Sequence, residues 1–227
     1  MRKVTILIPH SEGKTSDGAY PPLMDISKET QRVLSLWSKP SKAQWGKLLG
    51  VKDKALEKAI LANKNILTSK TLPAIERYSG VIYNAIDYKS LNAAAQTKFD
   101  QTVRIVSAAF GLVKPKDLIP DYKCKINNFG LDKYWRSING NKLKDCFIID
   151  LLPQAHKKAV EYAHGLEIEF HVTKNGKKVP AGHAGKHIKG RFIRWLVKQK
   201  TIDEKVLKVL KEFKEDGFQW VNGRYVK

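Results

Sequence analysis

The fold is decided near the start of the chain by the stretch Val4-Thr5-Ile6-Leu7-Ile8-Pro9, which runs into His10-Ser11-Glu12-Gly13-Lys14-Thr15. The first five residues are mostly β-branched and apolar, and a proline follows them, a pattern typical of a buried strand. The residues after the proline are polar and include two glycines before residue 19. We therefore expect a buried strand over 4–8 that delivers a polar loop over 10–18.

Further strands and helices follow along the chain. Residues 103–107 and 147–150 have the composition of buried strands, and each leads into a polar turn or a helix. Apolar residues at helical spacing from 25 to about 38, ended by Pro40, predict a helix. This alternation predicts an α/β fold, a mixed sheet flanked by helices. The length of 227 residues fits a single domain over 1–227.

The last third of the chain contains two hairpin signals. Residues 166–172 alternate at period two, which predicts a half-exposed strand, and 174–177 supply a turn for a hairpin near residue 175. Helices are expected over 190–200 and 204–215. Asn222-Gly223, between the apolar runs 217–221 and 224–226, is the signature of a type I′ hairpin turn.

A pair of short helices is predicted over 42–49 and 54–61, separated by Gly50-Val51-Lys52, with Asp53 as the N-cap of the second helix. This pair partly matches a helix-hairpin-helix, whose tight turn presents backbone amides to the phosphates of one DNA strand. The usual turn carries Gly-hydrophobic-Gly, and here Lys52 takes the third position. An ordinary αα-hairpin fits the pattern equally well.

The overall charge indicates a polyanionic partner. Lysine and arginine number 42 against 22 acidic residues, a formal net charge of +20. Such a charge repels itself unless a polyanion or salt screens it, while 42% apolar residues are enough to build a core. We see no signal-peptide core or membrane-spanning run, and we expect no membrane contact. Cys124 and Cys146 fit no metal or redox spacing, as expected in a reducing cytoplasm.

The positive charge is densest between His171 and Ile202, where nine lysines and arginines occur with no acidic residue. A solvated helix face normally mixes signs, so we favour a polyanion-binding surface over a solubilising one. Interleaved glycines would let backbone amides and cations approach phosphate together. His183 and His187 have metal-ligand spacing, but no carboxylate lies nearby and we assign no metal. The candidate nucleic-acid-binding residues are Gly50, Lys52, Lys54, Lys186, Lys189, Gly190, Arg191 and Arg194.

The Gly13-Lys14-Thr15 segment follows a strand and so invites comparison with a phosphate-binding P-loop. The first glycine of that motif would fall at Ile8, inside the strand. Nucleotide hydrolysis of the P-loop type is therefore not expected.

Six segments, in order along the chain, resemble the successive motifs of the YaaA family of peroxide stress proteins. The opening resembles the branch of that family that begins Pro-Pro-Ser-Glu-Gly-Lys-Thr. Together the segments span nearly the whole length, which makes them more specific than any one alone. They are 9–15, 78–88, 107–122, 131–135, 149–151 and 183–192.

The resemblance implies an α/β fold with a positively charged cleft and a helix-hairpin-helix-like element. It also implies binding to duplex or distorted DNA and protection from peroxide by limiting iron-driven damage. The sequence departs from the family pattern at two places. His10 replaces the second proline of the opening, and Leu152-Pro153 replaces the Arg-Ser that often follows Asp-Leu.

Many residues of the matched segments are polar or ionisable, and in one cleft they would resemble a reaction site. Lys14 or Lys186, if desolvated beside another cation, would have a lowered pKa and could form a Schiff base with an aldehydic sugar. Glu12 or Asp117 would then move protons, unless Asp117 only caps its loop. The candidate catalytic residues are Lys14, Glu12, Asp117 and Tyr83, and further cleft residues are Ser11, Tyr122 and His183.

Three classes of function fit these patterns. The first is a DNA-binding stress protein, which binds without sequence preference. The second is a hydrolase or lyase acting on a nucleoside, nucleotide or damaged base, with a small nucleotide-like ligand. The third is an RNA-binding protein, because charge alone does not separate DNA from RNA, although no RNA-recognition motif is visible. No cofactor is expected in any of them, and control of iron could be indirect.

Overall fold

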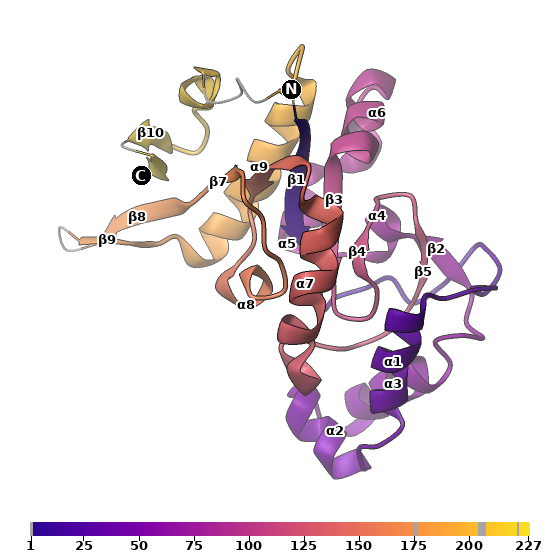
Figure 1. The fold of residues 1–227 in the computed structure, drawn as a ribbon. Helices are drawn as coiled ribbons and strands as arrows, with labels where there is room; N and C mark the ends of the chain where they lie inside the picture. Colours follow the sequence, from indigo (N-terminus) through magenta and orange to yellow (C-terminus); the bar gives the residue numbers. More distant parts are fainter. Residues whose placement is uncertain (1, 175–176, 204–207, 222) are drawn as a thin grey trace.

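The computed structural model describes residues 2–174, 177–203, 208–221 and 223–227, and these ranges contain a five-stranded sheet of order β4-β3-β1-β6-β7 (Figure 1). β1 pairs parallel with β3 and β6, and β6 pairs parallel with β7, whereas β3 and β4 are antiparallel. The predicted α/β class and mixed sheet are confirmed. The strands are β1 (Lys3–Pro9), β3 (Val103–Ser107), β4 (Gly111–Val113), β6 (Cys146–Asp150) and β7 (Gly165–Glu167).

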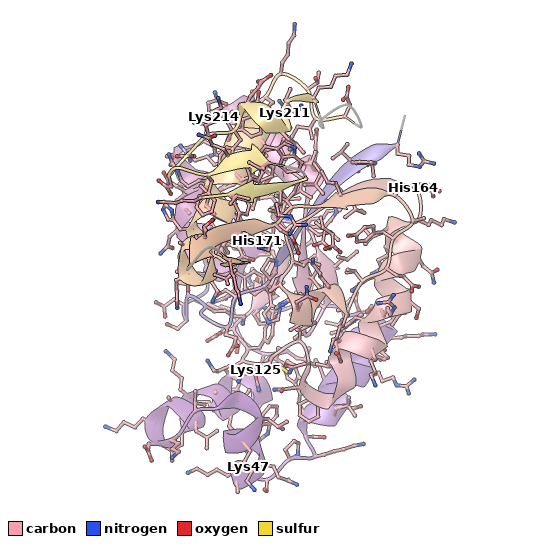
Figure 2. The ribbon with its side chains drawn as sticks, turned by 90° about the vertical axis from the view of Figure 1, so that its left-hand side faces the viewer. Lys47, Lys125, His164, His171, Lys211 and Lys214 are labelled. Carbon is pink, nitrogen blue, oxygen red and sulfur yellow. The ribbon has the colours of Figure 1, made fainter. Side chains whose placement is uncertain are left out.

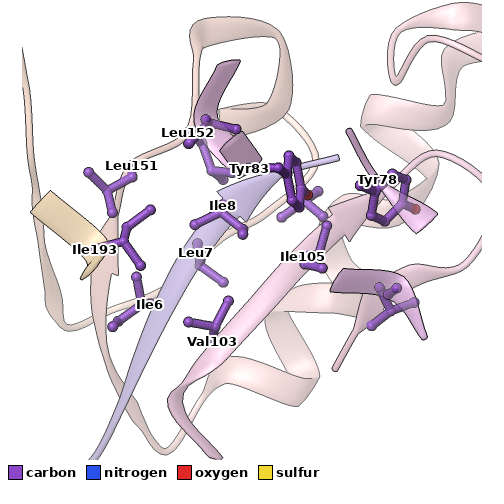
Figure 3. Close-up of a cluster of buried hydrophobic side chains, with 14 of the residues drawn as sticks. Ile6, Leu7, Ile8, Tyr78, Tyr83, Val103, Ile105, Leu151, Leu152 and Ile193 are labelled. Carbon is purple, nitrogen blue, oxygen red and sulfur yellow. The ribbon is translucent and has the colours of Figure 1, made fainter. Parts of the chain in front are cut away.

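The central position of β1 follows from its composition. A parallel strand covered on both faces needs apolar side chains at nearly every position. Ile6, Leu7 and Ile8 are completely buried, and Figure 3 shows them beside Val103 of β3 and Leu151 after β6.

Some helices flank this sheet, and others form a separate group at one end of it. Figure 1 shows α1, α2 and α3 together at the bottom of the molecule, away from α6 and α9. α5 and α9 pack against each other closely: a Cβ on Gly190 would lie 2.4 Å from the carbonyl oxygen of Ile82. The helices are α1 (Lys28–Trp37), α2 (Lys42–Leu49), α3 (Asp53–Lys64), α4 (Ala74–Arg77), α5 (Val81–Ile86), α6 (Ala93–Thr102), α7 (Leu131–Leu143), α8 (Gln154–Lys157) and α9 (Gly182–Lys198).

The predicted helix pair is present as α2 and α3. Ser41 and Gln44 form a capping box at the start of α2, and Gly50 ends it in the left-handed conformation, with φ of 67°. The prediction that Asp53 caps α3 is wrong. Lys52 occupies the N-cap position without a side-chain hydrogen bond, and Asp53 is the first helical residue, with φ of 49°. A short polar side chain can adopt this conformation locally.

The single strand predicted over 166–172 is divided between two sheets. β7 belongs to the main sheet, and β8 (Phe170–Lys174) belongs, in the described part of the chain, to a four-stranded sheet of order β10-β11-β8-β9. Ile168 lies between them, and its N–H donates to Asp150 O over 2.8 Å. β2 (Thr71–Pro73) pairs antiparallel with β5 (Leu118–Pro120). The remaining strands are β9 (Lys177–Pro180), β10 (Gln219–Val221) and β11 (Arg224–Val226).

Both predicted hairpins are present, because β8 pairs antiparallel with β9 and β10 with β11. The turn residues 175–176 and 222 lie outside the described ranges. α9 begins at Gly182, eight residues before the predicted start at 190. The helix predicted over 204–215 lies partly outside the described residues, and the helical geometry in 208–215 is 3-10, at Lys208 and in the turn Leu210–Glu212. The carbonyl of Leu210 accepts hydrogen bonds from the hydroxyl of Tyr225 over 2.7 Å and from Phe213 N over 3.3 Å.

No helix in the described ranges is long and apolar enough to cross a membrane.

Candidate functional site

A cavity of about 740 Å³ lies at the carboxyl ends of β1, β6 and β7. From β1 the chain continues to β3 on one side and later returns to β6 on the other, so the strand order reverses between β1 and β6. Ligands of open α/β sheets bind in the crevice at such a reversal. The cavity is lined by residues 9–13 after β1, 151–157 after β6, 168–171 after β7, and by 80–82, 125–127 and parts of 181–189.

The loop after β1 is held in place by Arg77, whose guanidinium is buried at the end of α4. It donates to the backbone carbonyls of Thr15, Asp17, Lys70 and Ile119. Arg77 thus anchors the part of the loop around Thr15 and Asp17, while Ser11, Glu12 and Gly13 line the cavity. Arg77 is not recognisable in the sequence, because nothing in the local pattern shows that its partners are backbone carbonyls.

Among the described residues, four lysines line the cavity together with Glu12 and Glu169. Lys189 donates from Nζ to Leu151 O over 2.7 Å, and burial lowers its pKa to about 8, although Asp150 acts in the opposite direction. Lys186 is exposed. Lys157 forms ion pairs with Glu167 and Glu169, so its charge is compensated. The fourth lysine is Lys125.

Two histidines, His10 and His156, line the cavity and lie against each other. His156 lines the cavity, and its Nε2 lies 3.2 Å from Nδ1 of the buried His10. The His10 ring also meets the carbonyls of Val106 at 3.0 Å and Cys124 at 3.2 Å. Burial lowers the pKa of both rings, that of His156 to about 4, so both are neutral at pH 7. In the sequence, His10 stands out only as a departure from the family pattern, and no motif points to His156.

Lys14 lies behind the loop wall. Its Nζ donates to Ser11 O over 2.9 Å and lies 4.0 Å from the ring centroid of Tyr122. Burial lowers the pKa of Lys14 to about 7, against the opposing effect of Asp121. The hydroxyl of Tyr122 bonds to those of Tyr78 and Ser107, each at 2.9 Å. Lys14 is therefore an amine with a substantial neutral fraction at pH 7, which is the form that acts as a nucleophile.

The remaining predicted catalytic residues are not brought together. Tyr83 is buried and donates to Pro9 O over 2.9 Å, beside Ile8 (Figure 3). Asp117 is exposed and accepts from Lys114 N over 2.8 Å, which closes its own loop. Neither is among the described residues that line the cavity, and the same holds for His183, which is exposed on α9. Of the predicted polar set, Ser11, Glu12 and Lys186 converge on the cavity, together with Lys189.

Several of the predicted nucleic-acid-binding positions in α9 have internal partners. Arg191 is paired with Glu215. Arg194 donates to the carbonyls of Ile86 and Asp87 at 2.9 and 2.7 Å. Gly190 has no side chain and thereby allows α5 and α9 to approach closely. These contacts tie α9 to its neighbours and occupy groups that would otherwise face a ligand.

The positions in the α2–α3 connection, by contrast, are open. Gly50, Lys52 and Lys54 are exposed. A Cβ on Gly50 would lie 3.4 Å from Nζ of Lys125, which itself lines the cavity. Figure 2 shows Lys125 between the α2–α3 pair and the body of the molecule that carries His171. Lys125 therefore connects the helix pair to the cavity.

His183 and His187 lie four residues apart on α9, but His187 Nδ1 lies 3.3 Å from a carboxylate oxygen of Asp216. In the part of the chain that the structure describes, no three His, Cys, Asp or Glu side chains gather where they could hold a metal ion.

Comparison with known proteins gives consistent results. The family model for the peroxide stress protein YaaA matches residues 4–223. A UPF0246 protein from Streptomyces coelicolor is 28% identical over 240 residues, covering 94% of this chain and 90% of that protein. A UPF0246 protein from Corynebacterium glutamicum is 30% identical over 211 residues, covering 84% of each chain. One from Pseudoalteromonas translucida is 25% identical over 243 residues, covering 95% of this chain and 92% of its own.

Proposed function

Because the chain belongs to the YaaA family of peroxide stress proteins, we propose that it binds duplex or distorted DNA in the cytoplasm and thereby limits iron-driven damage. The interaction surface in this proposal joins two groups of lysines. It begins at the helix-hairpin-helix-like pair α2–α3 and continues along the lysines of the cavity. The whole chain acts as one domain.

The observation that carries this proposal is the position of Lys125 between the two groups of cations. It lines the cavity and approaches Gly50 in the turn of the helix pair, next to the exposed Lys52 and Lys54. A duplex bound at the turn would thus meet Lys125 next and, beyond it, the lysines of the cavity. With a net charge of +20, attraction to phosphate is strong at low salt.

Contacts of this kind position the protein on DNA and do not read its sequence. The left-handed Gly50 allows the backbone of the turn to approach a strand closely, and Lys52 and Lys54 supply the charge. Affinity is therefore expected to depend on salt and on the shape of the duplex.

The test is fluorescence anisotropy with labelled duplex, bubble-containing duplex, single-stranded DNA and RNA at several salt concentrations. The double variant Lys52→Glu/Lys54→Glu should bind duplex at least about tenfold more weakly and show a salt slope smaller by about two. The matched control is Lys211→Glu/Lys214→Glu, since these exposed lysines lie at the opposite end of the molecule (Figure 2). Equal weakening in both variants, or stronger binding to RNA than to any DNA, would contradict the proposal.

A second candidate function is a lyase reaction, favoured by the lowered pKa of Lys14. The neutral amine would attack the aldehyde carbon of an abasic sugar, and loss of water would leave an imine. Borohydride reduces such an imine to a stable secondary amine, which mass spectrometry locates. An adduct at Lys14 that disappears in Lys14→Met supports this reaction. No adduct with abasic DNA, or one confined to exposed lysines, refutes it.

A further inference from the structure

The cavity at the carboxyl ends of β1 and β6 has the size of a ligand site. Small-molecule sites usually occupy roughly 300–1,000 Å³ and combine an apolar wall with a few polar groups. Its volume of about 740 Å³ falls within that range. The apolar wall comes from several separate segments of the chain and includes Val81, Ile82, Ile126, Leu152, Ile168 and Phe170.

One wall of the cavity is a single stripe of α9. Gly182, Gly185, Lys186 and Lys189 all line the cavity and are spaced at i, i+3, i+4 and i+7, which places them on one face of the helix. In the described part of the chain, nothing stands within 4 Å of the place that a Cβ on Gly182 would occupy. The stripe thus offers open space at its start and two ammonium groups further along.

The two lysines of this stripe differ from Lys157 in their surroundings. Lys157 is paired with Glu167 and Glu169. Within the described ranges, neither Lys186 nor Lys189 forms an ion pair, and Lys189 donates to the carbonyl of Leu151. A bound anion stabilises the charged form of a partly buried lysine that has no carboxylate partner. Phosphate suits this role because its oxygens accept hydrogen bonds from several donors at once.

Another part of the lining carries groups suited to a nucleoside. Ser11 and Glu12 come from the loop after β1. A hydroxyl and a carboxylate pair with the hydroxyl and amino groups of a sugar and base. The apolar residues of the lining suit the face of a base.

We propose that this cavity binds one nucleoside monophosphate unit, with its phosphate at Lys186 and Lys189 and its base against the apolar wall. The unit has two sources, a free mononucleotide or an unpaired nucleotide extruded from a DNA strand. Extrusion requires unstacking, which is least costly at a mismatch or a damaged base. Only the strand source rests on the proposed DNA-binding function.

Titration calorimetry with the four deoxynucleoside monophosphates, the corresponding nucleosides and inorganic phosphate tests the site. At least one monophosphate should bind about tenfold or more tightly than its nucleoside and than inorganic phosphate. Lys186→Ala and Lys189→Met should each weaken that binding about tenfold, whereas Lys211→Ala leaves it unchanged. Equal affinity of nucleoside and nucleotide, or no binding of any monophosphate, overturns the proposal.

A second variant separates loss of the site from loss of the fold. Ala155 is exposed and lines the cavity, so Ala155→Trp fills the space without disturbing the core. Its melting temperature should match that of the wild type while nucleotide binding is lost. Retained binding in this variant places the nucleotide elsewhere and refutes the assignment.

The source of the nucleotide is distinguished with a duplex that carries 2-aminopurine at a mismatch. Fluorescence that rises on binding and falls when free mononucleotide competes identifies an extruded nucleotide. Mononucleotide binding without that rise identifies a free nucleotide. Lys52→Glu/Lys54→Glu should lose duplex binding and still bind mononucleotide like the wild type. A wild-type protein that binds mononucleotide but no duplex counts against the DNA-binding function and not against the cavity.

Discussion

Nε2 of His156 lies 3.2 Å from Nδ1 of His10, across 146 residues of sequence. The contact joins the loop after β1 to α8, which follows β6, and so links two segments that line the cavity. Both rings are withdrawn from solvent, and His10 additionally meets the carbonyls of Val106 and Cys124. The pair is therefore a neutral, structural connection at pH 7.

This pair should make the protein sensitive to acid. Burial lowers the pKa of His156 from its ordinary 6.5 to about 4, so between these values the unfolded chain binds more protons than the folded one. Stability is then lost as the pH falls from about 6.5 to about 4, by up to about 1.4 kcal/mol per pH unit. Urea unfolding at several pH values should show a smaller slope in His156→Gln. The exposed His164→Gln should keep the wild-type slope, and equal slopes in all three proteins would contradict the prediction.

Lys14 should make the stability of the protein depend on pH in the alkaline range. Its pKa is lowered from 10.5 to about 7 by burial, with Lys123 acting in the same direction. The unfolded chain holds the extra proton between these values, so the free energy of unfolding gains a positive contribution as the pH rises from about 7 to about 10.5. Lys14→Met should remove this contribution, and Lys28→Met, an exposed change on α1, should not. Parallel pH profiles for the two variants in chemical unfolding would refute it.

Replacing Arg77 should loosen the loop after β1. Arg77→Met leaves the carbonyls of Thr15, Asp17, Lys70 and Ile119 without their donor, and a buried acceptor left unpaired is costly. We expect a loss of about 3 kcal/mol in the free energy of unfolding and faster proteolysis within residues 10–20. Arg136→Met, which breaks an exposed ion pair with Glu161, should cost under about 1 kcal/mol. A similar loss in both variants would show that Arg77 has no special anchoring role.

Two glycines of α9 should respond differently to alanine. At Gly190 the new Cβ would lie 2.4 Å from Ile82 O, so α5 and α9 must separate, at a cost of about 2–3 kcal/mol. At Gly182 the space is open within the described structure, and only the positive φ of 57° opposes the change, at a cost of about 1 kcal/mol. Thermal unfolding of the two variants measures the difference. A reversed order of melting temperatures would be inconsistent with the packing of α5 on α9.

The main strands could be predicted because runs of apolar residues along the chain indicate that these strands are buried. Residues 4–8 carry apolar side chains at four of five positions and residues 103–107 at three of five, a pattern that a strand covered on both faces favours. The sequence predicted a single strand over 166–172, and the structure divides it between β7 and β8. Its alternation continues unbroken through Ile168, and local pattern does not show that the chain changes sheets there.

The site could be predicted only in part. Ser11 and Glu12 follow a buried strand, and the carboxyl end of such a strand is where an α/β sheet binds its ligand. Lys189 was predicted as a surface contact, and its contact with Leu151 depends on how β6 and α9 meet. Asp117 closes its own loop, which was the alternative stated from the sequence, whereas the hydrogen bond from Tyr83 to Pro9 O follows from no sequence motif.

By itself, the sequence determined the α/β class, the charge and the family, because each depends on composition or on ordered local motifs. The apolar run over 4–8 and the polar loop after it are properties of neighbouring residues. Only the tertiary structure decided that His10 meets His156, that Lys14 is enclosed beside Tyr122, and that Lys125 connects the α2–α3 pair to the cavity. These relationships join positions far apart in the chain, and their distances and pKa shifts arise from burial that exists only once the sheet and helices have packed.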